Sequence, residues 1–223
     1  MDKLFIEARK KFDLNAVKLE LLDSLPGDKI ALAGTVQYLE LIDPVKKYLE
    51  SKGKEVIVKS GAYYDGHVLG CNSSALNSEC DTFLMVTDGR FHAINNAIQL
   101  QKEIYVFTTH TLEKVEQSEI DEHNKKTLTR QKKYLFADVI GLLVSSKVGQ
   151  HQKNIFAVKK RIEDSGKRVY VFESDNINTL EFENFPQVQM WVNTACFGLG
   201  RDDMRIVNLS DVLTFLSGDK NRQ

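Results

Sequence analysis

The sequence predicts an α/β protein built from two repeated small domains, each with a mostly parallel four-stranded sheet flanked by helices. Short, nearly continuous apolar runs, typical of strands that are buried on both faces of a sheet, alternate with amphipathic helical segments. The order strand, helix, glycine, strand also occurs twice along the chain. With 223 residues, 42% of them hydrophobic, the chain is long and apolar enough to bury two small cores.

The charge balance and the spread of apolar residues exclude several classes of protein. Thirty basic and 31 acidic residues give a net charge of −1, which excludes a strongly cationic surface for nucleic acid. No run of about 18 apolar residues is present, so we expect no contact with a membrane interior. The first residues, MDKLFIEARKKF, mix charged and apolar side chains and do not resemble a secretory signal, so we expect a cytoplasmic protein.

The first half of the chain contains an arm and one complete α/β domain. Apolar positions before Pro26-Gly27 predict an N-terminal helical arm over residues 1–27. The first domain then covers residues 28–122 and contains the cysteine Cys71. Its predicted strands are 29–36, 55–58, 81–86 and 103–107, and its predicted helices are residues 40–53 and 92–100.

The second domain, residues 123–223, repeats this plan and contains Cys196. The segment VKKYLESKGKEVIV, which starts at Val45, is similar to VKKRIEDSGKRVYV, which starts at Val158. Each segment predicts a helix that ends at a glycine, followed by a strand. The predicted strands are 138–144, 168–172 and 188–192, the predicted helix is 152–165, and the polar stretch 108–124 with a helix carrying Arg130 joins the domains.

Three cysteines are too few, and odd in number, for a disulfide framework, and no CxxC pair is present. Cys80 opens a predicted strand and is interpreted as structural. Cys71 and Cys196 each follow an apolar run, which predicts that both thiols lie at carboxyl ends of strands, where open α/β sheets bind ligands. Two thiols are fewer than the four ligands of a structural zinc or the three thiolates of an open 4Fe–4S cluster. Two interpretations of these cysteines therefore stay open. They are ligands of a metal site, or they are small side chains buried in the hydrophobic core.

Several short motifs occur together in one order. They are LAGTVQ (32–37), GHVLGC (66–71), GRFH (89–92), SKVGQ (146–150), NTAC (193–196) and RDD (201–203). In this order they resemble the diphthamide synthase family, the archaeal-type 2-(3-amino-3-carboxypropyl)histidine synthases. The resemblance implies three repeated α/β domains that each give one cysteine to a 4Fe–4S cluster. The two domains of this chain are similar to the second and third of them.

The resemblance also implies an activity and a set of site residues. Family members cleave S-adenosylmethionine reductively and transfer a 3-amino-3-carboxypropyl radical to a histidine of translation elongation factor 2, as an unusual radical S-adenosylmethionine type of transferase. Cys71 and Cys196 are then the cluster ligands. The residues expected to contact cofactor or substrate are Gln37, Gly89, His92, Gly149, Gln150, Arg201 and Asp203.

The chain departs from the family pattern at several positions. His67 stands where the family has Gln, Ala93 stands where it has Pro, and Phe197-Gly198 stand where it has Pro-Arg. The first family domain has no counterpart before Lys29. We therefore expect a homo- or hetero-oligomer in which a second chain or a dimer completes the cluster.

Two other functions stay open. One is a non-catalytic diphthamide-synthase-like subunit or scaffold without its own cluster. The other is an unrelated small-molecule binder, because doubly wound scaffolds host many functions. No GxGxxG or GxxxxGK[ST] sequence is present, which argues against nucleotide binding of those two kinds.

Overall fold

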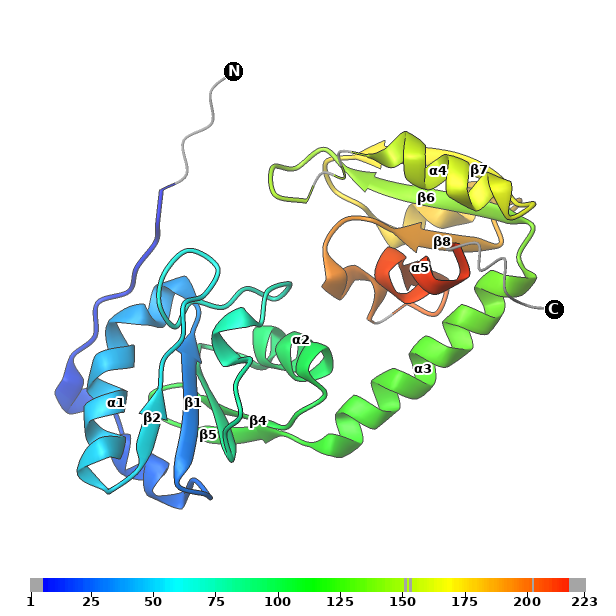
Figure 1. The fold of residues 1–223 in the computed structure, drawn as a ribbon. Coiled ribbons are helices and arrows are strands. Elements are labelled where there is room, and N and C mark those ends of the chain that lie inside the picture. Colours follow the sequence, from blue (N-terminus) through cyan, green and yellow to red (C-terminus); the bar gives the residue numbers. More distant parts are fainter. Residues whose placement is uncertain (1–5, 151, 153, 202, 217–223) are drawn as a thin grey trace. The chain divides into compact units, whose positions relative to one another are not determined.

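The computed structural model describes residues 6–150, 152, 154–201 and 203–216 (Figure 1). The chain divides into two compact units, Met1–Asp121 and Glu122–Gln223. The division falls inside helix α3 (Gln117–Phe136), which contains Arg130. No described helix combines the length and the apolar character that a bilayer crossing requires.

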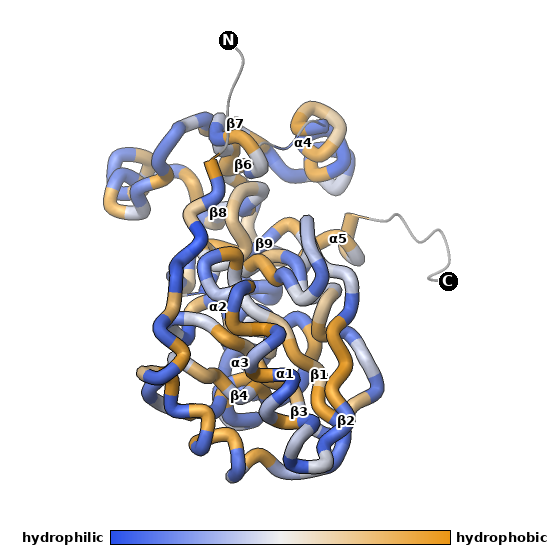
Figure 2. The backbone as a smooth tube through the Cα atoms, turned by 90° about the vertical axis from the view of Figure 1, so that its left-hand side faces the viewer, coloured by the Kyte–Doolittle hydropathy of each residue, from blue (hydrophilic) through white to orange (hydrophobic). Residues whose placement is uncertain are grey.

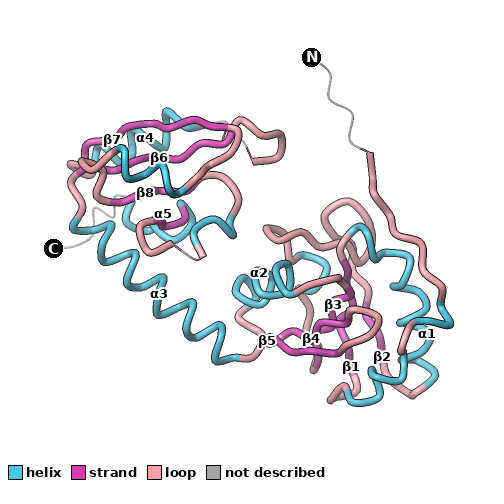
Figure 3. Tube along the Cα trace, turned by 180° about the vertical axis from the view of Figure 1, so that it is seen from behind, coloured by secondary structure: helices cyan, strands magenta, loops and turns pink. Residues whose placement is uncertain are grey.

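The first unit contains a five-stranded mixed sheet in the order β2-β1-β3-β4-β5 (Figure 3). Neighbouring strands from β2 to β4 run parallel, and β5 pairs antiparallel with β4. The strands are β1 (Lys29–Gly34), β2 (Glu55–Ile57), β3 (Thr82–Val86), β4 (Ile104–Phe107) and β5 (Leu112–Val115). The helices are α1 (Ile42–Ser51) and α2 (Arg90–Leu100), with short 3-10 turns η3 (Val36–Leu41) and η4 (Ser74–Leu76).

Successive side chains of β1 and β3 enter two different cores, one on each face of the sheet. Ile30 and Leu32 pack in the core that contains residues of α1, whereas Ala31 and Ala33 pack in the core that contains residues of α2. This arrangement explains why the central strands are apolar at nearly every position (Figure 2). The nearly continuous apolar runs thus correspond to strands that are covered on both faces.

The second unit has a four-stranded, fully parallel sheet in the order β7-β6-β8-β9. This is the order of β2-β1-β3-β4 in the first unit, so the predicted repeat is confirmed at the level of topology. The strands are β6 (Val139–Ser145), β7 (Arg168–Ser174), β8 (Met190–Asn193) and β9 (Ile206–Asn208). The helices are α4 (Ile155–Asp164) and α5 (Leu209–Leu216), with 3-10 turns η5 (Thr179–Asn184) and η6 (Phe197–Gly200).

Two glycines terminate equivalent helices, as the sequence predicts. Gly53 follows α1 with φ +82°, and Gly166 follows α4 with φ +89°. Only glycine adopts this left-handed conformation without a steric penalty. Both helices therefore end at the same point before the next strand.

The first sheet has one more strand than the four predicted. β5 lies in the stretch 108–124, which the sequence analysis treats as a polar linker. The chain reverses at Thr109, whose φ is +77°, and Thr108 N donates to Thr111 O at 3.1 Å. Because β5 is an antiparallel edge strand with mixed polar and apolar side chains, it lacks the continuous apolar run by which the other strands are recognised.

The predicted helical arm is wrong in its secondary structure. Residues 1–5 lie outside the described residues, and the rest of the arm contains only the 3-10 turns η1 (Leu14–Ala16) and η2 (Leu19–Ser24). The apolar residues of this arm lack the 3.6-residue period of an amphipathic helix. They are placed instead by turns, and Val17, Leu22 and Leu25 pack in the core on the α1 face of the first sheet.

Candidate functional site

The strand order defines the candidate site in each unit. In the first sheet β2 lies on one side of β1 and β3 on the other, so the strand order reverses between β1 and β3. In the second sheet the order reverses in the same way between β6 and β8. Ligands of open α/β sheets bind outside the carboxyl ends of the strands at this position. In the first unit the position is occupied by Thr35 and Thr87, whose hydroxyl oxygens are 3.4 Å apart.

Cys71 lies in a tight turn near the end of β1. The loop before it crosses this strand end, because Gly34 N donates to Gly66 O at 2.8 Å and Val68 N donates to Gly34 O at 3.0 Å. Leu69 and Asn72 then exchange two backbone hydrogen bonds of 3.1 and 3.2 Å, which leaves Cys71 exposed within the turn. The run before Cys71 is thus a loop with a single bridge to β1 rather than a strand.

Helix α2 anchors this turn through side-chain amides. Asn96 Nδ2 donates to Leu69 O at 2.9 Å, and Gln99 Nε2 donates to Gly70 O at 2.8 Å. A Cβ atom added at Gly70 would lie 3.7 Å from Cδ2 of His92. The predicted site residue His92 therefore lies next to the turn of Cys71. Burial lowers the pKa of His92, and the charge of Asp88 opposes part of this shift.

Gln37 and Gly89 lie after the two central strands of the first sheet. Gln37 is exposed in η3, and its backbone carbonyl accepts a hydrogen bond from Lys10 N at 3.0 Å. Gly89 is the residue before α2 and follows β3 in an extended conformation. Both positions are at the carboxyl edge of the sheet, as expected for loop residues that follow parallel strands.

The second unit has a pocket of about 180 Å³ at the carboxyl ends of its strands. It brings Gln150 and Cys196 together, which are two of the predicted site residues. Gly149 precedes Gln150 with φ +82°, in a turn closed by Gln150 N donating to Lys147 O at 3.1 Å. The other lining residues are Ser145, Lys147, Asp175, Asn176, Ile177, Ala195 and Leu199.

Asn193, at the end of β8, fixes the backbone around Cys196. Its Nδ2 donates to Cys196 O at 2.8 Å and to Asn208 Oδ1 at 2.7 Å, and its Oδ1 accepts from Ala195 N at 2.9 Å. Asn193 is only 3% exposed. The half-buried Cys196 is the residue immediately before η6, so its position depends on a buried amide network.

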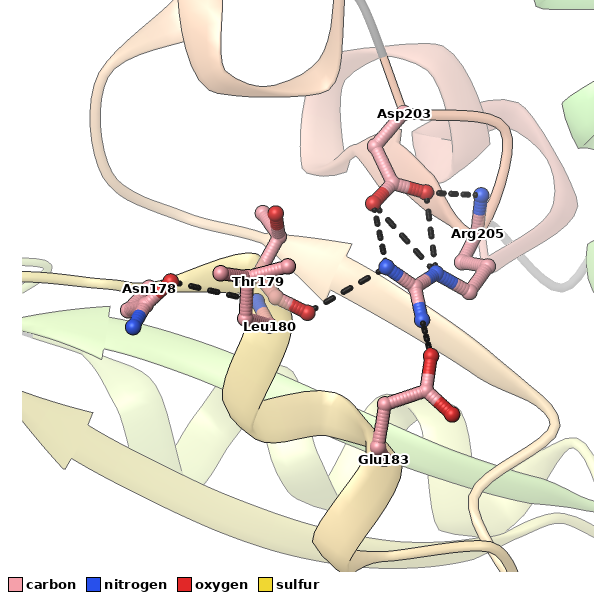
Figure 4. Close-up of polar contacts among 6 residues, drawn as sticks. All are labelled: Asn178, Thr179, Leu180, Glu183, Asp203 and Arg205. Atoms are coloured by element: carbon pink, nitrogen blue, oxygen red, sulfur yellow. Dashed lines mark hydrogen bonds and ion pairs between the residues drawn. The ribbon is translucent and has the colours of Figure 1, made fainter.

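Arg201 and Asp203 do not line the pocket that contains Cys196. The carboxylate of Asp203 accepts from Nε of Arg205 at 3.1 Å and from its Nη2 at 2.8 Å, and Arg205 also contacts Glu183 and Thr179 O (Figure 4). The hydrogen bond from Arg205 lowers the pKa of Asp203. The Arg201 carbonyl accepts from Arg130 Nη2 at 2.6 Å. These contacts connect the segment before β9 to η5 and to α3.

The sequence analysis did not identify Asp175 and Asn176, which line the pocket beside the SKVGQ motif. Lys147 donates to Asn176 Oδ1 at 2.5 Å, and Asp175 accepts a hydrogen bond from Ser146. Asp175 and Asn176 follow β7, so the rule that loops after parallel strands line the site could have found them. His67 is buried, and its ring centroid lies 5.8 Å from that of Tyr63 and 5.9 Å from that of Tyr64. Neither of its ring nitrogens has a hydrogen-bond partner among the described residues.

Each unit has one free cysteine at the carboxyl edge of its sheet. Cys71 and Cys196 are free, and one of them lies at the carboxyl edge of each sheet. Within the described part of the chain, no three His, Cys, Asp or Glu side chains come together in a group that could hold a metal ion. Cys80 packs against the core on the α2 face and accepts a hydrogen bond from Ser78 Oγ at 3.3 Å. Each unit thus offers one cysteine sulfur at this edge, and soft sulfur ligands suit an iron–sulfur cluster.

The fold and these sites define a repeated α/β protein with one cysteine at the carboxyl edge of each sheet. A sequence profile of the diphthamide synthesis protein family matches residues 1–206, and the chain belongs to this family. The family resemblance predicted from the motifs is therefore confirmed.

Two archaeal relatives are named 2-(3-amino-3-carboxypropyl)histidine synthase. The Pyrococcus horikoshii enzyme is 26% identical over 181 residues, covering 79% of this chain and 52% of the relative. The Methanocaldococcus jannaschii enzyme is 28% identical over 182 residues, covering 79% of this chain and 47% of the relative. The chain spans about half the length of these curated relatives.

Two solved structures of Dph2 from Pyrococcus horikoshii share the fold. One has a TM-score of 0.79 at 23% sequence identity, and the match covers 93% of this chain and 65% of the solved chain. The other, described as containing a 4Fe-4S cluster, has a TM-score of 0.75 at 24% sequence identity. This match covers 88% of this chain and 59% of the solved chain. The predicted α/β fold class is thereby confirmed.

Proposed function

We propose that this chain acts in diphthamide biosynthesis, in the cytoplasm, as a component of an enzyme that transfers a 3-amino-3-carboxypropyl group from S-adenosylmethionine to a histidine of translation elongation factor 2. The observation that carries the proposal is the presence of one free cysteine at the ligand-binding edge of each sheet, in a member of the diphthamide synthesis protein family. The two named archaeal synthases support the same reaction.

In this proposal Cys71 and Cys196 each hold one iron of a 4Fe–4S cluster. A second chain, or a second copy of this one, supplies the remaining protein ligand. When bound, the cluster would supply the electron that cleaves S-adenosylmethionine. The chain's own contribution is positional: the amides of α2 hold the turn of Cys71, and Asn193 holds the backbone of Cys196.

The pocket beside Cys196 fits the amino-acid end of S-adenosylmethionine. Lys147 and Asp175 both line it and carry opposite charges, which match the carboxylate and ammonium groups of a zwitterion. Gln150 adds an amide that can both donate and accept hydrogen bonds. We therefore assign the binding of this part of the substrate to Gln150, Lys147 and Asp175.

The cluster is tested by anaerobic reconstitution of the full chain, alone and with a co-purified partner. We expect iron and sulfide to bind and the reduced protein to give an electron paramagnetic resonance signal. Cys71→Ser and Cys196→Ser should each lose bound iron, whereas the matched control Cys80→Ser should retain it. Absence of iron under both conditions would exclude the cluster and favour a non-catalytic subunit.

The substrate pocket is tested separately by calorimetry with S-adenosylmethionine on the protein without iron. Gln150→Ala should weaken binding by about tenfold, because one amide contact to a charged group contributes roughly 1.5 kcal/mol. The control Gln101→Ala changes an amide far along the chain, at the end of α2. Equal affinities of the two variants would contradict the assignment of this pocket.

A further inference from the structure

Helix α3 packs on the second unit through one of its faces. His123, Arg130 and Tyr134 on this face are 8%, 2% and 1% exposed, and their spacing in the sequence places them in one row along the helix. Arg130 Nη2 donates to Arg201 O at 2.6 Å, which ties the helix to the segment before β9. The helix is therefore anchored through this face, and the residues opposite it point away from the core of the second unit.

The opposite face of α3 carries three large apolar side chains that are exposed. Leu128, Leu135 and Phe136 are 58%, 48% and 86% exposed. With about 100° of rotation per residue, all three lie more than about 90° around the helix from Arg130 and Tyr134. A helix that packs through one face normally has polar residues on the other, and a group of exposed apolar side chains marks a binding surface.

Exposed lysine side chains stand between these apolar residues. Lys132 is one helical turn from both Leu128 and Phe136, and Lys125 is two turns before Lys132, so all of them lie on the same face. The sequence from His123 to Ala137 contains no acidic residue, and Lys132 forms no ion pair within the described part of the chain. The face is therefore both apolar and positively charged. We define the outer face of α3 as Lys125, Leu128, Lys132, Leu135 and Phe136.

The combination of charge and apolar surface indicates the chemistry of the partner. Nucleic acid would neutralise the lysines but would leave Leu128, Leu135 and Phe136 in contact with water, because the surface that it offers to lysine is phosphate. A bilayer would cover the apolar side chains, but it would also take up the ammonium group of Lys132, which lies between Leu128 and Phe136. A helix with a row of leucines flanked by carboxylates matches both kinds of residue at once.

We propose that the outer face of α3 is a docking surface for an acidic amphipathic helix of a different protein. Apolar side chains of the partner cover Leu128 and Leu135, whose spacing is the heptad repeat of paired helices. Carboxylates of the partner pair with Lys125 and Lys132, which have the same spacing. The pocket beside Cys196 is lined by other residues, so this surface is independent of the proposed transfer reaction.

The probe for this surface is a synthetic peptide of about three heptads, with leucine at positions a and d and glutamate at positions e and g. Repulsion between its own glutamates keeps the peptide from pairing with itself. In calorimetric titration of the full chain, we expect the Kd of this peptide to rise about fivefold when the salt concentration rises from about 0.05 M to about 0.5 M. A peptide with glutamine in place of each glutamate should bind at least about fivefold more weakly.

Two substitutions test the two kinds of contact. Lys132→Glu should raise the Kd of the acidic peptide by about three- to tenfold, because an attractive charge pair becomes a repulsive one. Leu128→Ser should raise it by about tenfold, because the leucines of the peptide lose an apolar neighbour. The matched controls lie on α4: Lys160→Glu makes the same change of charge at an exposed position, and Phe156→Ser removes a side chain that is 80% exposed. Both controls should bind the peptide like the original chain.

Several outcomes would overturn the proposal. Absence of peptide binding, or equal Kd values for Lys132→Glu and Lys160→Glu, would exclude the docking surface. Binding of phosphatidylserine vesicles or of polyuridylic acid that Lys132→Glu abolishes, without binding of the peptide, would assign the face to a membrane or to RNA. A change of the sedimentation coefficient in Leu128→Ser would show that a second copy of the chain covers the face instead. Should Leu128→Ser unfold the protein, as circular dichroism would reveal, Lys132→Glu and its control still decide.

Discussion

Substitution of Asn193 by alanine tests the amide network that holds Cys196. The side chain makes three hydrogen bonds, to Cys196 O, Ala195 N and Asn208 Oδ1. Each is worth roughly 0.5–1.5 kcal/mol, and Asn208, which is 6% exposed, loses a donor that water replaces poorly. We therefore expect Asn193→Ala to lower the free energy of unfolding of the second unit by about 3 kcal/mol.

The chain contains its own probe for this measurement. Its single tryptophan, Trp191, is 2% exposed in the second unit, so urea unfolding followed by its fluorescence reports on that unit. With a urea dependence of about 2 kcal/mol/M, a loss of 3 kcal/mol moves the midpoint by about 1.5 M. The midpoint should shift without a change in slope.

The matched control is Asn178→Ala. Asn178 is exposed and accepts one hydrogen bond, from Leu180 N at 3.1 Å, so its loss should cost less than about 1 kcal/mol (Figure 4). Equal midpoints for Asn193→Ala and Asn178→Ala would refute the idea that the buried network fixes the backbone of Cys196.

Three further predictions concern packing and pH. Gly141→Ala should destabilise the second unit by about 2 kcal/mol in the same fluorescence assay, because a Cβ on β6 would collide with the ring of Trp191. Burial lowers the pKa of His67 below its ordinary value of 6.5, so the unfolded chain binds the proton more readily. The free energy of unfolding should therefore fall as the pH drops below 6.5. In His67→Gln, the melting temperature measured by calorimetry should change less between pH 7 and 5. Arg205 holds the pKa of Asp203 below its ordinary value of 3.8, so the carboxylate stabilises the fold above pH 3.8. This contribution is lost as the pH falls through the lower pKa of the folded state. Asp203→Asn should therefore make acid unfolding below pH 3.8 less steep.

The sequence was sufficient to predict those parts of the fold that depend on local signals. Apolar runs such as 82–86 predict strands because both faces of these strands are buried. Gly53 and Gly166 predict helix ends because a helix commonly ends at a residue with a positive φ. Glycine is the residue that adopts this conformation at little steric cost. The position of Cys196 beside Gln150 follows from the rule that loops after parallel strands meet at one edge.

Features that depend on tertiary contacts were not predictable in the same way. The arm is placed by Val17, Leu22 and Leu25 in the core of the first unit, and no period in the sequence encodes these contacts. β5 is stabilised by pairing with β4, which the mixed polarity of its side chains does not indicate. Asn193 belongs to the predicted motif NTAC. Its hydrogen bonds to Cys196 O and Asn208 Oδ1 form only because β9 and the residue before η6 lie close to it in the fold.

The turn around Cys71 is secured through the carbonyl groups of Leu69 and Gly70, and its own side chain is exposed. Replacement of the sulfur atom therefore leaves the anchoring amides and the path of the backbone intact. It follows that, in the role proposed for Cys71, a single codon change would remove or restore the metal ligand with almost no penalty in folding. The proposed ligand and the scaffold that presents it are thus separable in this part of the molecule.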